Sequence, residues 1–423
     1  MKNNNPAPIA PSERIAAIDI IRGFALIGIL LVNLKYFAHP AMYQFVIGEN
    51  IWEGFNGFID SAIFILAEGK FYTMFSFLFG LGFIVFMDKA MKRSSRPKIF
   101  FARRLFILFI FGVIHAFLIW SGDILIAYAI AGFILLLFYK RKEKTLLVWS
   151  GIILSISIIP VLFMVAAFPL MEQIPGEEYS YANEMTMFIN EIETQIESSY
   201  YAYSEGSLLE VMEQRLTDTT FALSYSFFAY LSIIPMFLLG AYAGKRKILH
   251  DVKNHLPLIK KVWLISFIIG ASMTAVYYIN LQQVNFVSPS MHDIYTQVGS
   301  TIGNPSLMLF YVTSLVLLLQ KSMWQRILKP LTALGRMALT NYLMQSIICT
   351  FVFYSYGLGL YGSVTPPFYL LFVVVIIGGQ IVLSNWWLKR YYFGPAEWLW
   401  RSLTYGKKAK MKIQEEPEYK EVS

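Results

Sequence analysis

The first long apolar stretch, RIAAIDIIRGFALIGILLVNLKYFAH (residues 14–39), carries polar side chains at Asp19, Arg22 and Asn33 and ends in a histidine. An ionised side chain near the middle of a bilayer costs roughly 2.5 kcal/mol or more, so such residues usually face a cavity or a partner. On a helix, Asp19 and Arg22 are three residues apart and can pair, and Asn33 returns to nearly the same face. We expect either one polar stripe along a cavity or an ion pair at the membrane edge with a packing asparagine.

The composition is that of an integral membrane protein. Hydrophobic residues make up 57% of the 423 residues and charged residues 15%, whereas a soluble domain averages about 25% charged. The net charge of +8 is spread over short loops between apolar segments, which predicts the lipid bilayer, and no nucleic acid, as a partner. The single Cys349 cannot form an internal disulfide.

Ten apolar segments are long enough to cross roughly 30 Å of hydrocarbon. Their approximate limits are 15–37, 57–87, 104–121, 123–139, 145–168, 221–244, 262–281, 306–320, 338–356 and 367–388. The second is too long for one straight crossing, and it is either one helix or a broken element in which FIDSAIFILAEGK lies obliquely before FYTMFSFLFGLGFIVFM crosses. The sequence thus predicts an all-α fold, a polytopic membrane bundle of about ten transmembrane helices.

Loop charges alternate along the chain. Lys and Arg are abundant in segments 88–104, 140–144, 245–261 and 321–336 and in the tail after 388, and they are absent from 38–56, 282–305 and 357–366. Segment 169–220 holds eleven acidic residues and one basic residue. Because positive loops stay in the cytoplasm, we expect both termini to be cytoplasmic and segment 169–220 to lie outside.

The acidic segment divides the chain into three expected units. They are a five-span N-terminal bundle with the first polar helix (1–168), an extracytoplasmic acidic helical loop (169–220), and a five-span C-terminal bundle with a basic cytoplasmic tail (221–423). Within the loop, Ser207 and Glu210 form a capping-box pattern that predicts the start of a helix. The glutamates of the loop fit either a solvated surface or a lid over an external site.

Further polar residues stand in the predicted spans. His115 lies in the third span, and Asp123 stands at its outer end, eight residues and about two turns on. Asp60 lies toward the outer half of the second segment. The run GRMALTNYLMQS places four more polar residues on neighbouring turns: Arg336, Thr340, Asn341 and Gln345. Interhelical hydrogen bonding is the commoner explanation for any one of them, but together they predict a polar interior that opens to both sides. The residues that we expect to bind substrate there are Asp19, Arg22, Asn33, Arg103, Arg104, Arg336, Asn341 and Gln345.

Several signatures of soluble enzymes are missing from the sequence. There is no G-x-S-x-G elbow, no P-loop and no complete dinucleotide-binding glycine motif. No His/Cys cluster has metal-ligand spacing, so we expect no metal.

Four blocks in order resemble the YeiB-like family of bacterial membrane proteins. They are IDIIRGFALIGILLVN, RRLFILFIFGVIHAFLIWSGDILIAYAIAG, GRMALTNYLMQS and FGPAEWLWRSLTYG. The resemblance covers nearly the whole chain and implies a multi-pass protein of the bacterial plasma membrane. The C-terminal half of that family is a domain of unknown function.

The Asp-x-x-Arg-Gly opening of the first helix is similar to that of two membrane acyltransferase groups, the bacterial sugar and peptidoglycan O-acyltransferases and heparan-glucosaminide N-acetyltransferase. The first group has a histidine where this chain has Asn33, so that histidine is not carried over. The second group has asparagine there and a catalytic histidine in the following loop. The resemblance implies that His39 takes this role, although its spacing after the asparagine is shorter.

An acyl thioester made in the cytoplasm would suit this layout. Its phosphates need arginines at the inner mouth, where the sequence places Arg14, Arg22, Arg103 and Arg104. At the outer end an imidazole near neutral pKa could accept a proton from a hydroxyl or amine. We therefore expect His39 as the base, oriented by Asp60 or Asp123, with His115 as the competitor and a purely capping His39 as the alternative.

The sequence therefore predicts a transmembrane acyltransferase. It would move an acyl group from cytoplasmic acyl-CoA, its co-substrate, to an acceptor hydroxyl or amine on the outer side. The alternatives are a small-molecule transporter or carrier whose polar interior does no covalent chemistry, and a non-catalytic membrane scaffold. The sequence leaves the acyl group, the acceptor, and the choice between a monomer and a homodimer open.

Overall fold

A computed structural model describes residues 16–42, 52–93, 96–171, 181–285 and 287–413. These residues form helices and their connections, which confirms the expected all-α fold. The polar tail predicted before residue 15 lies outside the described residues, as do residues 172–180 of the acidic loop.

The helices are, in chain order, α1 (Ala16–Ala38), α2 (Gly54–Leu66), α3 (Lys70–Arg93), α4 (Pro97–Ile114), the π-helical turn η3 (His115–Ile119), α5 (Leu125–Phe138), α6 (Glu143–Ile156), α7 (Ile159–Met171), α8 (Tyr181–Ser204), α9 (Leu208–Lys245), α10 (Val252–Leu281), α11 (Met291–Leu318), α12 (Ser322–Leu328), α13 (Pro330–Arg336), α14 (Ala338–Phe353), α15 (Pro366–Leu388) and α16 (Pro395–Tyr405).

Seven helical segments among the described residues are long and apolar enough to cross a membrane. They are Ala16–Ala38, Gly54–Lys92, Pro97–Ile119, Glu143–Met171, Val252–Leu281, Met291–Leu318 and Pro366–Leu388. Two more predicted spans fall on the shorter apolar helices α5 and α14, and the predicted span 221–244 falls within the 38 residues of α9. The orientation of these helices in the bilayer stays a prediction.

The long segment 57–87 is two helices. α2 ends at Leu66 and α3 begins at Lys70, and Gly69 between them has a φ of +81°, which glycine adopts readily because it has no Cβ. A Cβ on Gly69 would also overlap the side chain of Asn304 on α11. The break therefore has a local cause in the sequence AEGK, and of the two alternatives the broken element is the one that forms.

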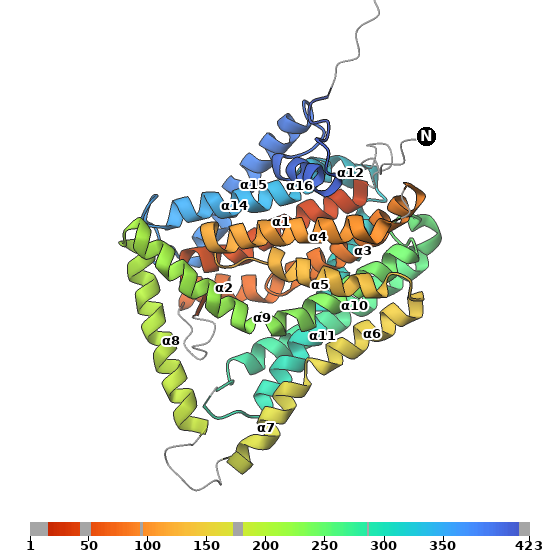
Figure 1. Cartoon of the computed structure of the whole chain (residues 1–423). Coiled ribbons are helices and arrows are strands. Elements are labelled where there is room, and N and C mark those ends of the chain that lie inside the picture. Colours follow the sequence, from red (N-terminus) through yellow and green to blue (C-terminus); the bar gives the residue numbers. More distant parts are fainter. Residues whose placement is uncertain (1–15, 43–51, 94–95, 172–180, 286, 414–423) are drawn as a thin grey trace, which may run out of the picture.

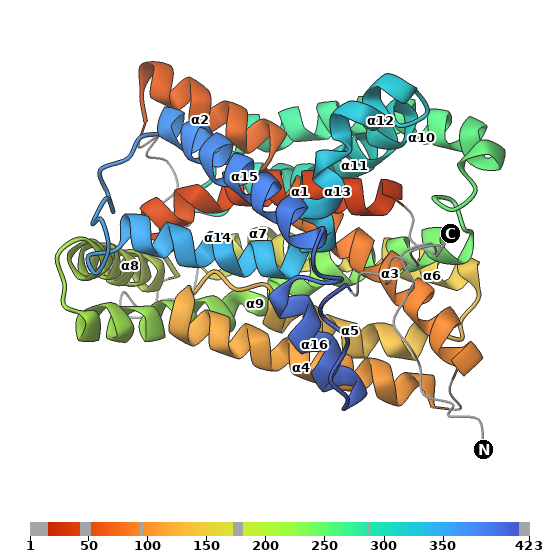
Figure 2. The same cartoon turned by 90° about the horizontal axis from the view of Figure 1, so that it is seen from above.

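Helix α1 lies in the centre of the bundle, where it packs against α3, α13, α14 and α15 (Figures 1 and 2). α3 packs along α9, and the two helices approach most closely at two glycines. A Cβ on Gly80 of α3 would overlap the backbone of Phe237, and a Cβ on Gly240 of α9 would overlap the backbone of Phe77. Small residues at such crossings let helix backbones approach closely in membranes. The segment GAYAG (residues 240–244) on α9 therefore serves close helix packing.

The loops sort to the two ends of the bundle as their charges predict. Residues from the Lys/Arg-rich segments meet at one end, the basic end, where Lys89, His250 and Arg336 line one cavity. Residues from the segments poor in Lys and Arg meet at the other end, the acidic end, where His39 contacts Tyr200 and Val364. α8 runs across the acidic end (Figure 1), and the capping box of Ser207 and Glu210 opens α9 as expected.

Candidate active site

His115 is positioned by a local change in helix geometry. α4 ends at Ile114, and residues His115–Ile119 form a π-helical turn before Trp120 becomes extended. Single π turns are frequent at functional sites. The chain then doubles back so closely on α4 that a Cβ on Gly112 would lie 2.6 Å from the Ile126 nitrogen and 3.0 Å from an Asp123 carboxylate oxygen. The glycine therefore allows Asp123 to lie beside the helix that carries His115.

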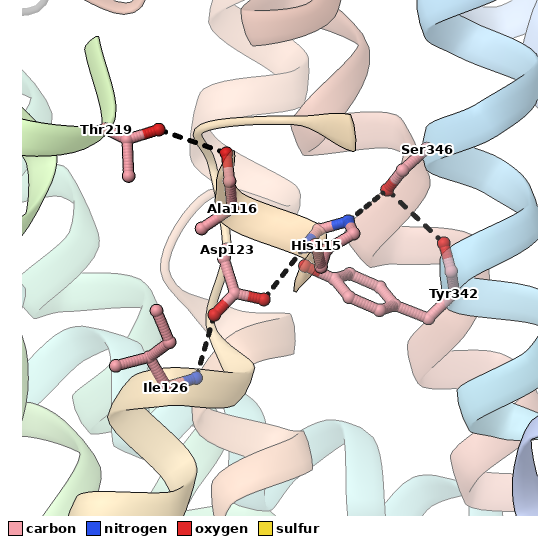
Figure 3. A network of polar contacts seen from close by, with 7 residues as sticks. All are labelled: His115, Ala116, Asp123, Ile126, Thr219, Tyr342 and Ser346. Carbon is pink, nitrogen blue, oxygen red and sulfur yellow. Dashed lines mark hydrogen bonds and ion pairs between the residues drawn. The ribbon is translucent and has the colours of Figure 1, made fainter. Parts of the chain in front are cut away.

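Three side chains from two distant parts of the sequence form one hydrogen-bonded chain at this turn (Figure 3). Nδ1 of His115 lies 2.8 Å from Oδ1 of Asp123, and Nε2 lies 2.8 Å from the Ser346 hydroxyl on α14. The second carboxylate oxygen of Asp123 accepts a hydrogen bond from the Ile126 backbone nitrogen at 2.8 Å. An ionised carboxylate only accepts, so the proton of the neutral imidazole belongs on Nδ1, and Nε2 is free to accept from Ser346.

The network is shielded from solvent, and α9 makes hydrogen bonds to the π turn that carries His115. The side chains of His115 and Asp123 are 0% and 2% exposed, and Ser346 is buried. α9 satisfies carbonyls of the π turn, because Thr219 donates to the Ala116 oxygen and Arg215 to the Leu118 oxygen. An imidazole fixed between a carboxylate and a hydroxyl is the arrangement that activates a nucleophile or removes a proton from an acceptor.

A cavity of about 620 Å³ leads from the basic end toward this network. Its inner wall is apolar and aromatic and includes Phe75, Phe79 and Tyr128, and it reaches Tyr342. The ring of Tyr342 lies 5.1 Å from that of His115 between centroids. Tyr342 therefore belongs to the cavity wall and lies beside the imidazole, one helical turn before Ser346.

The mouth of the cavity is strongly basic. Two carboxylates line it, Asp19 and Glu397. The Lys and Arg side chains that line it number five: Arg22, Lys89, Arg104, Arg336 and Arg401. Arg22 donates to Asp19 at 3.0 Å, as the sequence predicts. The guanidinium of Arg104 lies 3.6 Å from the ring centroid of Trp400 on α16, a cation–π contact that holds its charge at the cavity wall.

α16 forms part of this wall through a buried carboxylate. Glu397 accepts hydrogen bonds from the backbone nitrogens of Leu339 and Thr340, at 2.7 and 3.1 Å. It therefore satisfies N–H groups at the start of α14, which no residue within that helix can satisfy, and its negative charge suits the helix N-terminus. The sequence places the C-terminal segment near this end but does not predict that Glu397, Trp400 and Arg401 line a cavity.

The structure separates the residues that the sequence groups as substrate-binding. Asp19, Arg22, Arg104 and Arg336 line the cavity, whereas Asn33 and Arg103 lie outside its lining. Arg103 instead lies near Gly406, the C-cap of α16.

Asn341 and Gln345 also lie outside the cavity lining, in a hydrogen-bonded network between α14 and α15. Asn341 donates to Ser384 at 3.0 Å and Gln345 to Gln380 at 2.9 Å. Gln380 in turn donates to the Asn341 carbonyl. These amides join two helices, which is the common structural use of amides within a membrane bundle.

His39 has a different environment from His115. Its Nε2 lies 2.9 Å from the Val364 carbonyl, which requires the proton on that nitrogen, and its Nδ1 lies 3.2 Å from the Tyr200 hydroxyl. Burial lowers the pKa of the His39 imidazole and favours its neutral form. Neither predicted carboxylate is its hydrogen-bond partner, because Asp60 pairs with Lys35 at 3.3 Å and Asp123 with His115. His39 thus joins the end of α1 to α8 and to the loop before α15.

Comparison with known proteins gives relatives along nearly the whole chain. Residues 243–407 match the family "Protein of unknown function (DUF418)". The chain is 38% identical over 413 residues to the uncharacterized protein YxaH of Bacillus subtilis, a match that covers 94% of this chain and 96% of the relative.

Two further relatives extend this comparison. The chain is 30% identical to an uncharacterized 39.9 kDa protein in the amylase 3′ region of Bacillus acidopullulyticus, over 97% of this chain and 99% of that protein. It is 26% identical to the uncharacterized protein YeiB of Escherichia coli, over 93% and 96% of the two chains.

Proposed function

This chain belongs to the YeiB-like family, and we propose that it is a transmembrane acyltransferase that takes its acyl group from a cytoplasmic acyl-CoA. One observation carries the proposal: one cavity is lined both by a cluster of cationic side chains and by Tyr342, the aromatic residue beside His115. An acyl donor with a negatively charged head and an apolar arm matches a cavity that is basic at its mouth and apolar further in.

The charged head would bind at the basic mouth. The five cationic side chains and two carboxylates that line this end of the cavity give it a net charge of about +3. Arginine binds phosphate through two parallel N–H donors and tolerates burial better than lysine. Arg22 and Arg104 reach the cavity from different helices, α1 and α4, so two phosphate groups could be held at once.

The acyl arm would follow the apolar wall inward. Phe75, Phe79 and Tyr128 line this part of the cavity, and burial of apolar surface is worth about 25 cal/mol for each Å². The arm would end at Tyr342, beside the imidazole. The reacting carbonyl would then arrive where water is scarce and competing hydrolysis is suppressed.

His115 is the proposed general base, and Asp123 is its positioning carboxylate. The carboxylate holds the imidazole in the tautomer that leaves Nε2 as the acceptor, and it stabilises the imidazolium when a proton arrives. We prefer His115 to His39 as the base because Asp123 pairs with His115, whereas neither Asp60 nor Asp123 is a hydrogen-bond partner of His39. The acceptor hydroxyl or amine would come from the acidic end, which the sequence predicts to be extracytoplasmic.

Ligand-dependent thermal stabilisation of the purified protein tests donor binding. A ligand at 100 times its Kd adds about 2.7 kcal/mol to the free energy of unfolding, so acetyl-CoA or a longer acyl-CoA should raise Tm. Arg104→Gln should abolish the shift. Arg246→Gln should retain it, because Arg246 pairs with the exposed Glu143 and lies outside the cavity lining.

The absence of any shift with acyl chains of all lengths would oppose the proposal. Substrate-driven uptake into proteoliposomes without acyl transfer would favour the carrier instead.

A further inference from the structure

Ser346 stands out among the buried hydroxyls of α14. Thr350, one turn further on, donates to the Ile347 carbonyl of its own helix, as helical hydroxyls commonly do. Ser346 has the Tyr342 carbonyl available at 3.4 Å, but the much shorter contact of 2.8 Å is to Nε2 of His115. We propose that Ser346 is a nucleophile that receives the acyl group as a covalent ester; the identity of the acyl donor rests on the function proposed above.

The geometry is that of an activated serine. A hydroxyl is a weak nucleophile unless an adjacent base can take its proton, and the base is effective when a third group orients it. Here the hydroxyl, the imidazole and the carboxylate lie in one line of contacts at 2.8 Å each. This arrangement is recognised by geometry and roles rather than by order in the chain, and it recurs on unrelated folds.

A network that only stabilised the fold would not require the buried carboxylate of Asp123. A buried serine in a membrane helix can satisfy itself with the carbonyl four residues earlier, and a buried histidine can donate to one carbonyl, as His39 does. Placing a carboxylate behind the imidazole adds a costly buried group, yet Asp123 is held there by the Ile126 nitrogen and by the fold at Gly112. That cost is repaid when the imidazole accepts a proton.

The cavity ends at Tyr342, one helical turn before the serine. Tyr342 lines the cavity, and Ser346 follows it by four residues on the same helix, so the two side chains share a face of α14. In the proposed reaction, displacement of the Tyr342 ring would let a donor carbonyl at the inner end of the cavity meet the Ser346 oxygen. Tyr342 would act as the gate between the two.

The proposed reaction has two balanced steps. In the first, Ser346 Oγ attacks the thioester carbonyl, its proton passes to His115 Nε2, the C–S bond breaks, and the thiol leaves with that proton. In the second, an acceptor hydroxyl or amine attacks the Ser346 ester, its proton passes to Nε2, the C–O bond breaks, and the proton returns to Ser346 Oγ. The ester would carry the acyl group between a donor from the basic end and an acceptor from the acidic end.

A fluorophosphonate probe tests the nucleophile without any acyl donor. Purified protein in nanodiscs should form a covalent adduct that fragmentation mass spectrometry locates on Ser346. The adduct should disappear in S346A, form at least about 10²-fold more slowly in H115A because the base is lost, and form at the normal rate in T350A. Thermal unfolding of each variant shows whether it is folded. A folded wild-type protein that acquires no adduct at Ser346 would overturn the proposal.

Labelling with a radioactive acyl-CoA and no acceptor tests the acyl-enzyme itself. The ester on Ser346 should survive neutral hydroxylamine, whereas S346C should form a thioester that neutral hydroxylamine cleaves; Cys349 is resolved from it by fragmentation. If the probe labels Ser346 but no acyl-CoA reacts, the nucleophile stands and the proposed donor is wrong. Undiminished acyl transfer by a folded S346A protein would refute the nucleophile and leave the acyltransferase standing.

Discussion

Exchange of Asp123 for asparagine should inactivate the site while leaving the protein folded. The carboxylate accepts one hydrogen bond from His115 Nδ1 and one from the Ile126 backbone, both at 2.8 Å. An asparagine has one acceptor and one donor end. The backbone N–H of Ile126 cannot reverse, so it takes the amide oxygen, and the amide NH₂ must face Nδ1.

His115 can then accept a hydrogen bond from the asparagine NH₂ only if its proton moves from Nδ1 to Nε2. Nδ1 becomes the acceptor and Nε2 carries the proton, so Nε2 can no longer take a proton from Ser346 or from an acceptor. The equivalent exchange in a soluble serine protease lowers kcat about 10⁴-fold for this reason, and we expect a loss of similar size here. D123A would instead leave two buried N–H groups unpaired, at about 1–3 kcal/mol each. Its loss of activity could then not be separated from a loss of stability.

The rate of fluorophosphonate labelling and the release of free thiol from acyl-CoA both measure this effect, with Tm as the check on folding. D218N is the matched control, because Asp218 is also hydrogen-bonded through both oxygens, to Tyr203 and Gln214, but away from the imidazole. D218N should retain its rate. A folded D123N protein within about tenfold of wild type would refute the tautomer argument and with it the role of the His115 network.

Three further predictions concern other parts of the molecule. H39A should lower the free energy of unfolding by about 1–3 kcal/mol, measured by thermal unfolding, because it removes two hydrogen bonds between chain segments. The folded H39A protein should keep its turnover. An inactive H39A protein of normal stability would return the base role to His39. R22K should raise the Kd for acyl-CoA in a binding assay although charge is kept, because lysine lacks the planar fork; unchanged binding would make Arg22 only the structural partner of Asp19. A cysteine at Glu191 should react with an impermeant thiol reagent in intact cells and one at Lys98 should not; the reverse pattern would invert the proposed orientation.

Hydrophobicity and charge were enough to predict the all-α fold. The apolar runs give the helices, the polar interruption AEGK marks the break between α2 and α3, and the alternation of charged loops separates the two ends of the bundle. These features follow from local composition, because an apolar run must form a helix to satisfy its backbone in lipid. The pairing of Asp19 with Arg22 was predictable for the same reason, since the two are three residues apart on one helix.

The partners of His115 and His39 could not be predicted in the same way. Ser346 is 231 residues from His115, and serines in membrane helices usually bond within their own helix. The His115–Asp123 spacing was visible in HAFLIWSGD, but on a regular helix two turns would separate the side chains by about 12 Å. The π turn and the extended segment after it bring the two together. Tertiary geometry, rather than helical spacing, therefore decided which histidine received the carboxylate.

The release of thiol from acyl-CoA by the wild-type protein and by H115A, measured side by side in nanodiscs, tests the central claim most directly. We predict release by the wild type in the presence of an acceptor and a loss of at least about 10²-fold in H115A. Acyl-CoA should still raise the Tm of H115A, because the basic mouth that binds the donor is intact. Equal release by the two folded proteins, or no release from acyl-CoA of any chain length, would contradict the proposed acyltransferase.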